Sequence, residues 1–253
     1  MAATEHVQRR QPEGVPPLEL TGERTLPDVP AENYWYQRHV AVYRWIAERC
    51  GGLHVVDMAC GEGYGSDLLA QRALSVTGVD ANPDAHEHAR LKYTRPGIRF
   101  VRDLVENYRE EVDAVVFLQT IEHVEDPGQV LRHFRDMLPP GGTAYVSTPN
   151  VLTLAPEGAE KSDNPWHLKE YRAEEFRSLC ESAFEHVELL GLFHARKLRA
   201  HELALRLGWD RAHAALGITK PFYDRFTPAI SQRDFALRGG PLDRALDFLA
   251  VLR

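Results

Sequence analysis

The stretch that decides the fold is Val55-Val56-Asp57-Met58-Ala59-Cys60-Gly61-Glu62-Gly63-Tyr64-Gly65. It begins as an apolar strand, continues as a turn with glycine at every second position, and leads into a helical pattern from Ser66 to Arg72. Glycine has no side chain, so such a turn offers backbone N–H groups to a ligand at the start of the helix. The stretch therefore predicts a strand, a turn and a helix that together hold a nucleotide-like cofactor.

The residues after the turn repeat this alternation of strand and helix. The run Ala114-Val115-Val116-Phe117-Leu118 is almost wholly apolar, as expected of a parallel strand covered on both faces. Strands are predicted at 53–58, 75–80, 98–101, 114–118 and 143–147, and helices at 66–72, 83–93 and 127–137. This order predicts an α/β fold with a doubly wound, mostly parallel sheet, right-handed crossovers and helices on both faces.

The chain is predicted to form one domain at 21–253 behind a disordered lead at 1–20, which is rich in polar residues and proline. A lid helix is expected at about 32–50, with Asn33 as its cap, because aromatic and apolar residues recur there at helical spacing. The cofactor core follows at about 53–150, a substrate-side and cap segment at about 151–244, and a final strand at about 245–252. Within the substrate-side and cap segment we expect a helix at 173–183, a strand at 187–193 and a helical insertion at 195–226.

Composition excludes several classes of protein. The chain has 253 residues and a net charge of −7, with no block of Lys or Arg longer than two, which argues against a nucleic-acid binder. No run approaches 18 apolar residues, and the polar N-terminus has no apolar signal segment, so we expect no membrane span, no membrane partner and a cytoplasmic location. Three widely spaced cysteines support neither disulfides nor a thiolate zinc site. A small-molecule or carbohydrate partner fits this composition; the oligomeric state is not predicted.

Two carboxylates follow neighbouring predicted strands. Asp80 ends its strand 17 residues after Gly63, where a carboxylate can accept hydrogen bonds from both hydroxyls of a ribose. Asp103 follows the next strand, where it can accept the exocyclic amine of an adenine. The nicotinamide fingerprint Gly-x-Gly-x-x-Gly is not matched, because the sixth position from Gly61 is Ser66.

From Val55 to Asn150 the chain resembles the core of class I S-adenosylmethionine-dependent methyltransferases. The resemblance implies a Rossmann-like sheet of seven strands with a helical cap insertion, and S-adenosylmethionine as cofactor. It also implies cofactor contacts from the glycine turn and from the residues that follow the next three strands: Asp57, Ala59, Gly61, Gly63, Asp80, Ala81, Asp103, Leu104 and Gln119. The family usually has glycine where Ala59 stands, and a methyl group is tolerable there if φ is negative.

The flanking motifs extend the resemblance. Five segments are similar to those of actinobacterial sugar O-methyltransferases related to the methylmannose polysaccharide 1-O-methyltransferase group. They are Thr21-Gly22-Glu23-Arg24-Thr25-Leu26-Pro27, Glu32-Asn33-Tyr34-Trp35-Tyr36-Gln37-Arg38-His39, Ser147-Thr148-Pro149-Asn150, Asn164-Pro165-Trp166-His167 and Gly191-Leu192-Phe193-His194. This implies polysaccharide biosynthesis and O-methylation of a sugar, glycoside or small natural product, with a methylated mannoside as one example. It also implies that the lid helix covers the cofactor, with Tyr34 or Arg38 near its carboxylate.

Three histidines are candidates for the acceptor site. His123 follows the strand that ends at Leu118, and imidazole can take the proton of an attacking hydroxyl, so His123 is the predicted catalytic base. His167 and His194 each follow an aromatic residue and are predicted substrate contacts, together with Glu122. No metal site is predicted, although Glu122 and Asp126 are weak candidates for Mg²⁺.

Three alternative functions remain open. One is a methyltransferase that acts on a quinone or an amine, for which residues 195–226 would form an apolar acceptor cap; that segment is in fact charged. Another is a non-catalytic scaffold that keeps the cofactor pocket. A nicotinamide dehydrogenase is the third, disfavoured by the spacing of the glycines.

Overall fold

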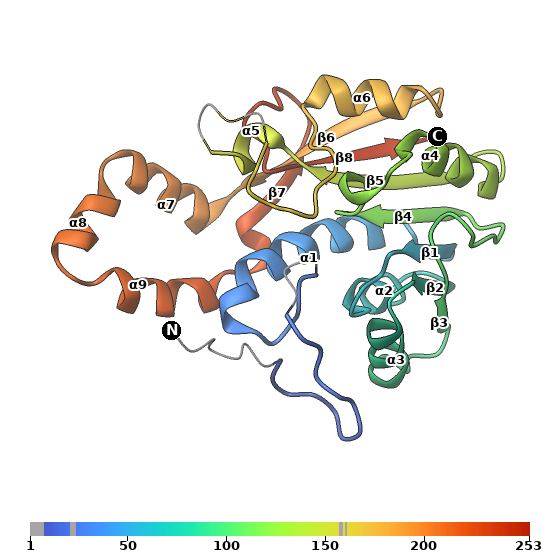
Figure 1. Cartoon of the computed structure of the whole chain (residues 1–253), viewed down its shortest axis with the longest axis horizontal. Helices are drawn as coiled ribbons and strands as arrows, with labels where there is room; N and C mark the ends of the chain where they lie inside the picture. The colour runs from blue at the N-terminus through green and yellow to red at the C-terminus, as the bar shows by residue number, and fades with distance from the viewer. Residues whose placement is uncertain (1–7, 21–23, 157–158, 160) are drawn as a thin grey trace.

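In the computed structural model, residues 8–20, 24–156, 159 and 161–253 are described, and they form one eight-stranded sheet (Figure 1). The spatial order is β3-β2-β1-β4-β5-β8-β6-β7, in which the first five strands are parallel and the last three pair antiparallel. The strands are β1 (His54–Met58), β2 (Ser75–Asp80), β3 (Ile98–Arg102), β4 (Ala114–Leu118), β5 (Thr143–Pro149), β6 (Val187–His194), β7 (Phe235–Arg238) and β8 (Asp247–Leu252).

The expected seven-stranded sheet is therefore matched only approximately. The additional strand is β7, which pairs with the C-terminal half of β6, from Gly191 to His194. All the other strands were predicted, with β3, β5 and β6 one or two residues longer than expected. The five parallel strands form the expected Rossmann-like half of the sheet.

Helices cover both faces of the sheet, as predicted. Buried side chains of α1 and α2 pack with Val55, Val76 and Val116 on one face, and those of α4 and α6 pack with Val56, Val115 and Phe248 on the other. The α-helices are α1 (Asn33–Ala47), α2 (Tyr64–Leu69), α3 (Pro83–Lys92), α4 (Pro127–Met137), α5 (Val151–Leu154), α6 (Ala173–Glu181), α7 (Arg196–Arg206), α8 (Trp209–Ala215) and α9 (Thr219–Phe226). Four 3₁₀ turns are η1 (Pro30–Glu32), η2 (Ile121–His123), η3 (Thr227–Ala229) and η4 (Gln232–Asp234). Within the described part of the chain, no helix has the length and apolar character needed to cross a membrane.

The N-terminal segment differs from the expected disordered lead. Residues 1–7 lie outside the described residues, but 8–20 pack against the glycine turn. The Gln8 amide donates to Glu62 Oε1 at 2.9 Å, and the Pro16 carbonyl lies 2.7 Å from His88 Nδ1. Val15 and Leu18 are buried. The segment is thus a strap held to the core by polar and apolar contacts.

The start of α1 also differs from the expectation that Asn33 caps it. The turn η1 runs directly into the helix, so Asn33 is its first residue and Glu32 precedes it with helical dihedral angles. The Asn33 amide instead donates to the carbonyls of Thr227 and Ile230, at 2.8 and 2.9 Å. The side chain ties α1 to the segment that follows α9.

Helices α7 to α9, called the cap below, project from one end of the sheet (Figure 1). Its inner side is an aromatic cluster whose ring centroids lie 4.7–6.4 Å apart, made of His201, Trp209, His213, Phe222, Tyr223 and Phe226. The sequence predicted a helical insertion here, and the structure resolves it into three helices around this cluster.

Candidate functional site

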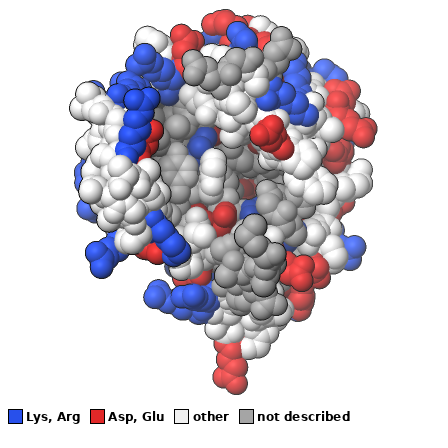
Figure 2. Space-filling view, turned by 60° about the vertical axis from the view of Figure 1, so that its left-hand side comes forward, with Lys and Arg blue, Asp and Glu red and all other residues white. Residues whose placement is uncertain are grey.

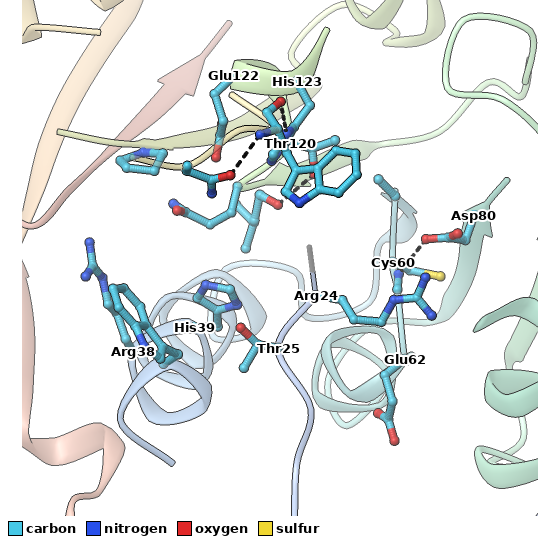
Figure 3. A pocket seen from close by; sticks show the side chains of 18 of the residues that line it. Arg24, Thr25, Arg38, His39, Cys60, Glu62, Asp80, Thr120, Glu122 and His123 are labelled. Atoms are coloured by element: carbon cyan, nitrogen blue, oxygen red, sulfur yellow. Dashed lines mark hydrogen bonds between the residues drawn. The ribbon is translucent and has the colours of Figure 1, made fainter. Parts of the chain in front are cut away.

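A cavity of about 1080 Å³ opens at the C-terminal ends of β1, β2 and β4. The chain turns in opposite directions along the sheet on either side of β1 and β4, and such a switch point leaves a crevice for a ligand. The walls come from the N-terminal strap, α1, the glycine turn, the ends of β2 and β4, and the loop at 164–168 (Figure 3). Residues far apart in the sequence therefore face one space.

The glycine turn has the geometry that its sequence predicts. Gly61 and Gly63 have φ of +56° and +95°, in the left-handed region that favours glycine. A Cβ on Gly63 would lie 2.8 Å from the Cβ of Ala89, so a larger residue does not fit. At Gly61 a Cβ would meet nothing within 4 Å, so the backbone there is open to a ligand. This is a cradle of the kind that a nucleoside-bearing cofactor needs.

Ala59 departs from the expectation that its φ is negative. Its φ is +55°, and Gln119 at the end of the neighbouring strand β4 has φ of +52°. Left-handed conformations are strained for residues with a side chain, and such strain concentrates at functional sites. Both residues line the cavity. Gln119 is held there by hydrogen bonds from its backbone N–H and its side-chain amide to Ser147 Oγ, at 3.1 and 3.0 Å.

Asp80 braces the turn and faces the cavity (Figure 3). Its Oδ2 accepts from the Gly61 N–H at 2.8 Å, and its Oδ1 accepts from the Asn82 N–H at 2.9 Å. A carboxylate oxygen has a second lone pair, so both oxygens can still accept from a diol. Ala81 lines the cavity beside it.

A second hollow of about 520 Å³ adjoins the first and shares Ala59, Asp80, Ala81, Thr120 and His123 with it. Leu104 lines this hollow, as expected for a residue near a base. Asp103 lines neither hollow; its Oδ1 accepts from the Leu104 N–H at 2.8 Å instead. In this structure the Asp103 side chain shapes the loop that carries Leu104.

Asp57 lies beneath the turn, fully buried and outside the cavity lining. It accepts hydrogen bonds from the Tyr43 hydroxyl at 3.1 Å and the Ser66 hydroxyl at 2.7 Å. Burial raises the pKa of Asp57 to about 7. The residue joins α1 and α2 to β1 and supports the turn from behind.

Two predicted residues of the lid helix point elsewhere. Arg38 lines the cavity, but its guanidinium is held by Asp247 at 2.6 and 2.5 Å and by the Leu246 carbonyl at 2.8 Å. Tyr34 is outside the cavity lining and its hydroxyl lies 2.9 Å from His194 Nε2. His194 is likewise outside the lining, although it was a predicted substrate contact.

His123 has a defined tautomer. Its Nδ1 lies 2.9 Å from the carbonyl oxygen of Trp166, which only accepts hydrogen bonds, so Nδ1 carries the hydrogen. In the neutral ring Nε2 is then the basic nitrogen. The residue lines both hollows, where the ends of β4 and the loop at 164–168 meet (Figure 3).

Glu122 is buried beside it and also lines the cavity. Its Oε2 accepts from the Thr148 hydroxyl at 3.1 Å, and burial raises its pKa to about 8. Its backbone carbonyl accepts from the N–H groups of Leu168 and Lys169, at 2.8 and 3.2 Å. These bonds hold the loop at 164–168 over the cavity.

His167 lies next to His123, with ring centroids 4.9 Å apart, and lines the cavity as predicted. Its Nδ1 is 2.6 Å from Glu170 Oε1, and its Nε2 is 3.0 Å from the side-chain amide of Asn164. Both ring nitrogens thus have partners within residues 164–170, and these bonds fix the ring in the wall of the cavity.

Glu122, His123 and His167 offer ligand atoms within 4.8 Å of one another, so these three could hold a metal ion. Two imidazoles and a carboxylate suit zinc-like metals better than Mg²⁺, which takes oxygen ligands. The weak candidate pair Glu122 and Asp126 is not brought together as a site. Asp126 lines only the second hollow, and its Oδ1 caps α4 by accepting from the Gln129 N–H at 2.8 Å.

Several lining residues were not predicted as site residues: Arg24, Thr25, Trp35, His39, Tyr64, Asn164 and Trp166. His39 Nδ1 lies 2.9 Å from the Tyr64 hydroxyl, and burial lowers its pKa to about 4. Arg24, Asn164 and Trp166 lie in motifs that the sequence analysis quoted, so their motifs were the available signal. No described residue of the cap lines the cavity. The charged composition of 195–226 therefore cannot be used to decide between a polar and an apolar acceptor.

Comparison with known proteins agrees with this geometry. A family model for a methyltransferase domain matches residues 34–202. A probable S-adenosylmethionine-dependent methyltransferase of Mycolicibacterium smegmatis is 44% identical over 184 residues, 72% of this chain and 71% of the relative. A ubiquinone biosynthesis O-methyltransferase of Pseudomonas aeruginosa is 35% identical over 128 residues, 46% of this chain and 55% of the relative. The structure of a possible histamine N-methyltransferase from Thermotoga maritima has a TM-score of 0.58 at 17% identity, over 88% of this chain and 95% of that chain, which shows a shared fold.

Proposed function

Because this chain belongs to the S-adenosylmethionine-dependent methyltransferases, we propose that it methylates a hydroxyl group of a sugar, a glycoside or a small natural product. A methylated mannoside is the first acceptor to consider. The observation that carries the proposal is the position of His123 in the wall of the cofactor cavity, with its Nδ1 hydrogen directed at a carbonyl. A hydroxyl needs a base as it attacks a methyl group, whereas many softer acceptors do not.

The residues of the cavity fit the cofactor. We propose that the backbone at Gly61 holds its amino-acid part, while Gly63, whose N–H donates to the Cys60 carbonyl at 3.1 Å outside the cavity lining, shapes the turn. We further propose that Asp80 accepts from its ribose and that the hollow beside Leu104 takes its adenine. Arg24 is the candidate partner for its carboxylate in place of Arg38, because Arg38 is already paired with Asp247. When bound, the cofactor supplies an electrophilic methyl group on a positively charged sulfur.

The chain's own contribution is orientation and proton transfer. In this proposal Nε2 of His123 receives the proton of the acceptor hydroxyl, while His167 and Glu122 border the acceptor. Positioning two reactants in one cavity supplies much of the rate, and a base adds typically 10²- to 10⁴-fold. The Trp166 carbonyl keeps Nε2 basic by holding the hydrogen on Nδ1.

The rim of the cavity supports a carbohydrate acceptor. Trp35 from α1 and Trp166 from the loop at 164–168 both line the cavity, and both are partly exposed. Aromatic faces pack against the C–H surfaces of sugars, and nearby polar groups read the hydroxyls. Asn164 lines the same cavity wall, and its side-chain amide keeps a second N–H beyond the one bonded to His167.

A quinone is the second candidate acceptor, since a relative is a ubiquinone biosynthesis O-methyltransferase. The apolar residues Leu154 and Leu168 in the same cavity wall favour it. The chemistry would be the same, because a phenolic hydroxyl also has to lose its proton.

Calorimetry with S-adenosylhomocysteine tests the cofactor assignment. We expect binding to the wild-type protein, loss of most binding in Asp80→Ala, and little change in Asp136→Ala, a matched control at an exposed aspartate of α4 that lines neither hollow. Absence of binding to the wild type would refute the cavity as the cofactor site. Product detection with methylated mannosides and with a phenolic quinol precursor then distinguishes the two acceptors. If neither acceptor gave a product, the alternative of a non-catalytic scaffold that keeps the cofactor pocket would be favoured.

A further inference from the structure

The cap differs in charge from the rest of the chain. Residues 196–226 contain seven cationic and three anionic side chains, a net charge of +4 in a chain whose total is −7. Figure 2, in which the side that carries the cap comes forward, shows Lys and Arg gathered above and below an uncharged area at the left of the face. The cap is therefore a net positive element in a chain that is net negative as a whole.

The uncharged part of the cap includes large apolar side chains in solvent. Leu203 and Leu207 are 58% and 81% exposed and lie one helical turn apart. Leu216 and Ile218, at the corner between α8 and α9, are 68% and 38% exposed. Soluble proteins rarely expose several large apolar residues together without a partner for them.

The internal packing of the cap explains why these residues stay outside. The interior is filled by the aromatic cluster, in which Phe222 stacks on His201 and His213 with interplanar angles of 16° and 11°. Leu203, Leu207 and Leu216 lie outside this aromatic interior, with more than half of each side chain exposed. Their position at the corners of the projection makes them available to a surface.

Several of the cationic side chains are also available. Among the described residues, no ion pair is formed by Arg196, Arg199, Arg211 or Arg225, and all four are exposed. Arg206 and Lys220, by contrast, pair with Glu202 and Asp224 on their own helices. The cap thus carries four exposed arginines without an ion pair as well as its exposed leucines.

We propose that the cap docks the protein on an anionic lipid surface. Peripheral attachment needs two signals, apolar side chains that enter the interface and basic side chains that meet anionic headgroups, and the cap carries both. Such attachment needs no membrane-spanning helix, and none is found among the described residues. The proposal is independent of the acceptor and of the proposed reaction.

Two other occupants fit the cap less well. Nucleic acid would use aromatic platforms for its bases, but the rings of the cap face inward. A second copy seated cap against cap would bring together two surfaces that each carry a net charge of +4. A lipid surface satisfies both the charge and the leucines.

Docking would also orient the cavity. The root of the cap is joined to α1 by the bonds of Asn33 to Thr227 and Ile230, and by the contact of Tyr34 with His194, whose Nδ1 lies 3.3 Å from Glu202 on α7. Helix α1 also carries Trp35 into the cavity wall. A lipid-attached cap therefore fixes the position of the cavity relative to the surface.

Flotation of the full chain with lipid vesicles tests the proposal. We expect the wild type to float with vesicles of phosphatidylcholine and phosphatidylglycerol, to remain below with phosphatidylcholine alone, and to dissociate as salt is added. Leu207→Glu combined with Leu216→Glu, and Arg199→Glu combined with Arg211→Glu, should each weaken binding at least about tenfold. Leu74→Glu, at an exposed leucine of the body, and Arg132→Glu, at an exposed arginine of α4, are the matched controls.

Three outcomes would overturn the proposal: no flotation of the wild type, equal flotation with neutral vesicles, or equal losses in the control variants. Self-association that the leucine variants abolish, without any vesicle binding, would assign the surface to a second copy instead. Circular dichroism checks that each variant is folded. Calorimetry with S-adenosylhomocysteine should give the same affinity for all variants, so a failure here is distinguishable from a failure of the proposed reaction.

Discussion

At the scale of single residues, His123 combines a place in the cavity wall with one defined basic nitrogen. We predict that His123→Gln lowers kcat by about 10²-fold, the typical contribution of a positioned base, and leaves the affinity for S-adenosylhomocysteine unchanged. Initial rates with a methylated acceptor at saturating cofactor measure the effect. His54→Gln, at the far end of β1 from the cavity, is the control and should keep wild-type activity.

If His123→Gln retained full activity while it still bound the cofactor, His123 would not be the base. The rate would then come from orientation and proximity without base catalysis by this residue.

Asp57 should make the stability of the fold depend on pH. Its pKa is raised to about 7 by burial, against 3.8 for an ordinary aspartate, so the folded state keeps a proton that the unfolded state releases between these values. The folded state binds more protons in that window, and its free energy of unfolding therefore falls as pH rises from about 4 to 7. We predict that Asp57→Asn removes this decline, although it loses one hydrogen bond to Tyr43 or Ser66.

Urea unfolding at pH 4.5 and pH 7.5 measures the difference. Relative to the wild type, Asp57→Asn should gain stability toward the higher pH, and parallel pH profiles of the two proteins would contradict the prediction.

Site residues that are placed by the local course of the backbone could be predicted from the sequence. Gly61, Gly63 and Asp80 lie where a strand meets a turn, so their positions follow from local sequence alone. The positions of Tyr34 and His194 could not be predicted, because they bond to each other across 160 residues. Asp57 was predicted at the turn, but only the packing of Tyr43 and Ser66 shows that its side chain points away from the cavity.

At the scale of elements, Glu62 connects the glycine turn with α3 and the N-terminal strap. Its buried carboxylate is within hydrogen-bond distance of the side chains of Gln8, His88, Lys92 and Tyr93, at 2.9, 2.9, 2.6 and 2.7 Å. These partners lower its pKa despite burial. The strap, which carries Leu20 into the cavity wall, is thus anchored on the turn itself.

We predict that Glu62→Gln lowers the free energy of unfolding by about 3–5 kcal/mol, because it leaves buried cationic partners without their anion. Glu87→Gln on α3, which breaks an exposed ion pair with Arg90, should cost less than about 1 kcal/mol. Urea denaturation measures the free energy of unfolding of both variants. Equal losses would show that the buried cluster around Glu62 stabilises the fold no more than the exposed ion pair does.

The parallel strands and α4 were predictable because their apolar runs are bounded by clear turn residues. Helix α4 has the predicted bounds, since Pro127 starts it and Pro139 follows its end. Strand β7 was missed because its four residues alternate weakly and become a strand only by pairing with β6. The three helices of the cap were predicted only as a mixed segment, because their inner side consists of aromatic and histidine residues rather than an aliphatic stripe.

At the scale of the whole molecule, one buried ion pair joins the first helix to the last strand. Arg38 on α1 and Asp247 on β8 are 209 residues apart, and both side chains are almost fully buried. We predict that Arg38→Ala destabilises the protein by about 3–5 kcal/mol, since it leaves Asp247 buried without a partner. Thermal unfolding in the presence and absence of S-adenosylhomocysteine measures this loss.

Replacement of both residues by apolar ones, Arg38→Met with Asp247→Leu, should recover most of the stability. If the double variant were as unstable as Arg38→Ala, the loss of stability would not come from the unpaired charge of Asp247. It would come from the packing and hydrogen bonds that the ion pair provides. Arg132→Ala on the surface of α4 is the control for loss of an arginine.

Strand β8 has a consequence for the order in which the protein can form during synthesis. It lies between β5 and β6, and both neighbours leave the ribosome before it. Until residues 247–252 emerge, the edges of β5 and β6 that face β8 have no partner, and unpaired edges invite association between chains. The parallel half of the sheet can therefore assemble during translation, while β6 and β7 join it only after the last strand has been made.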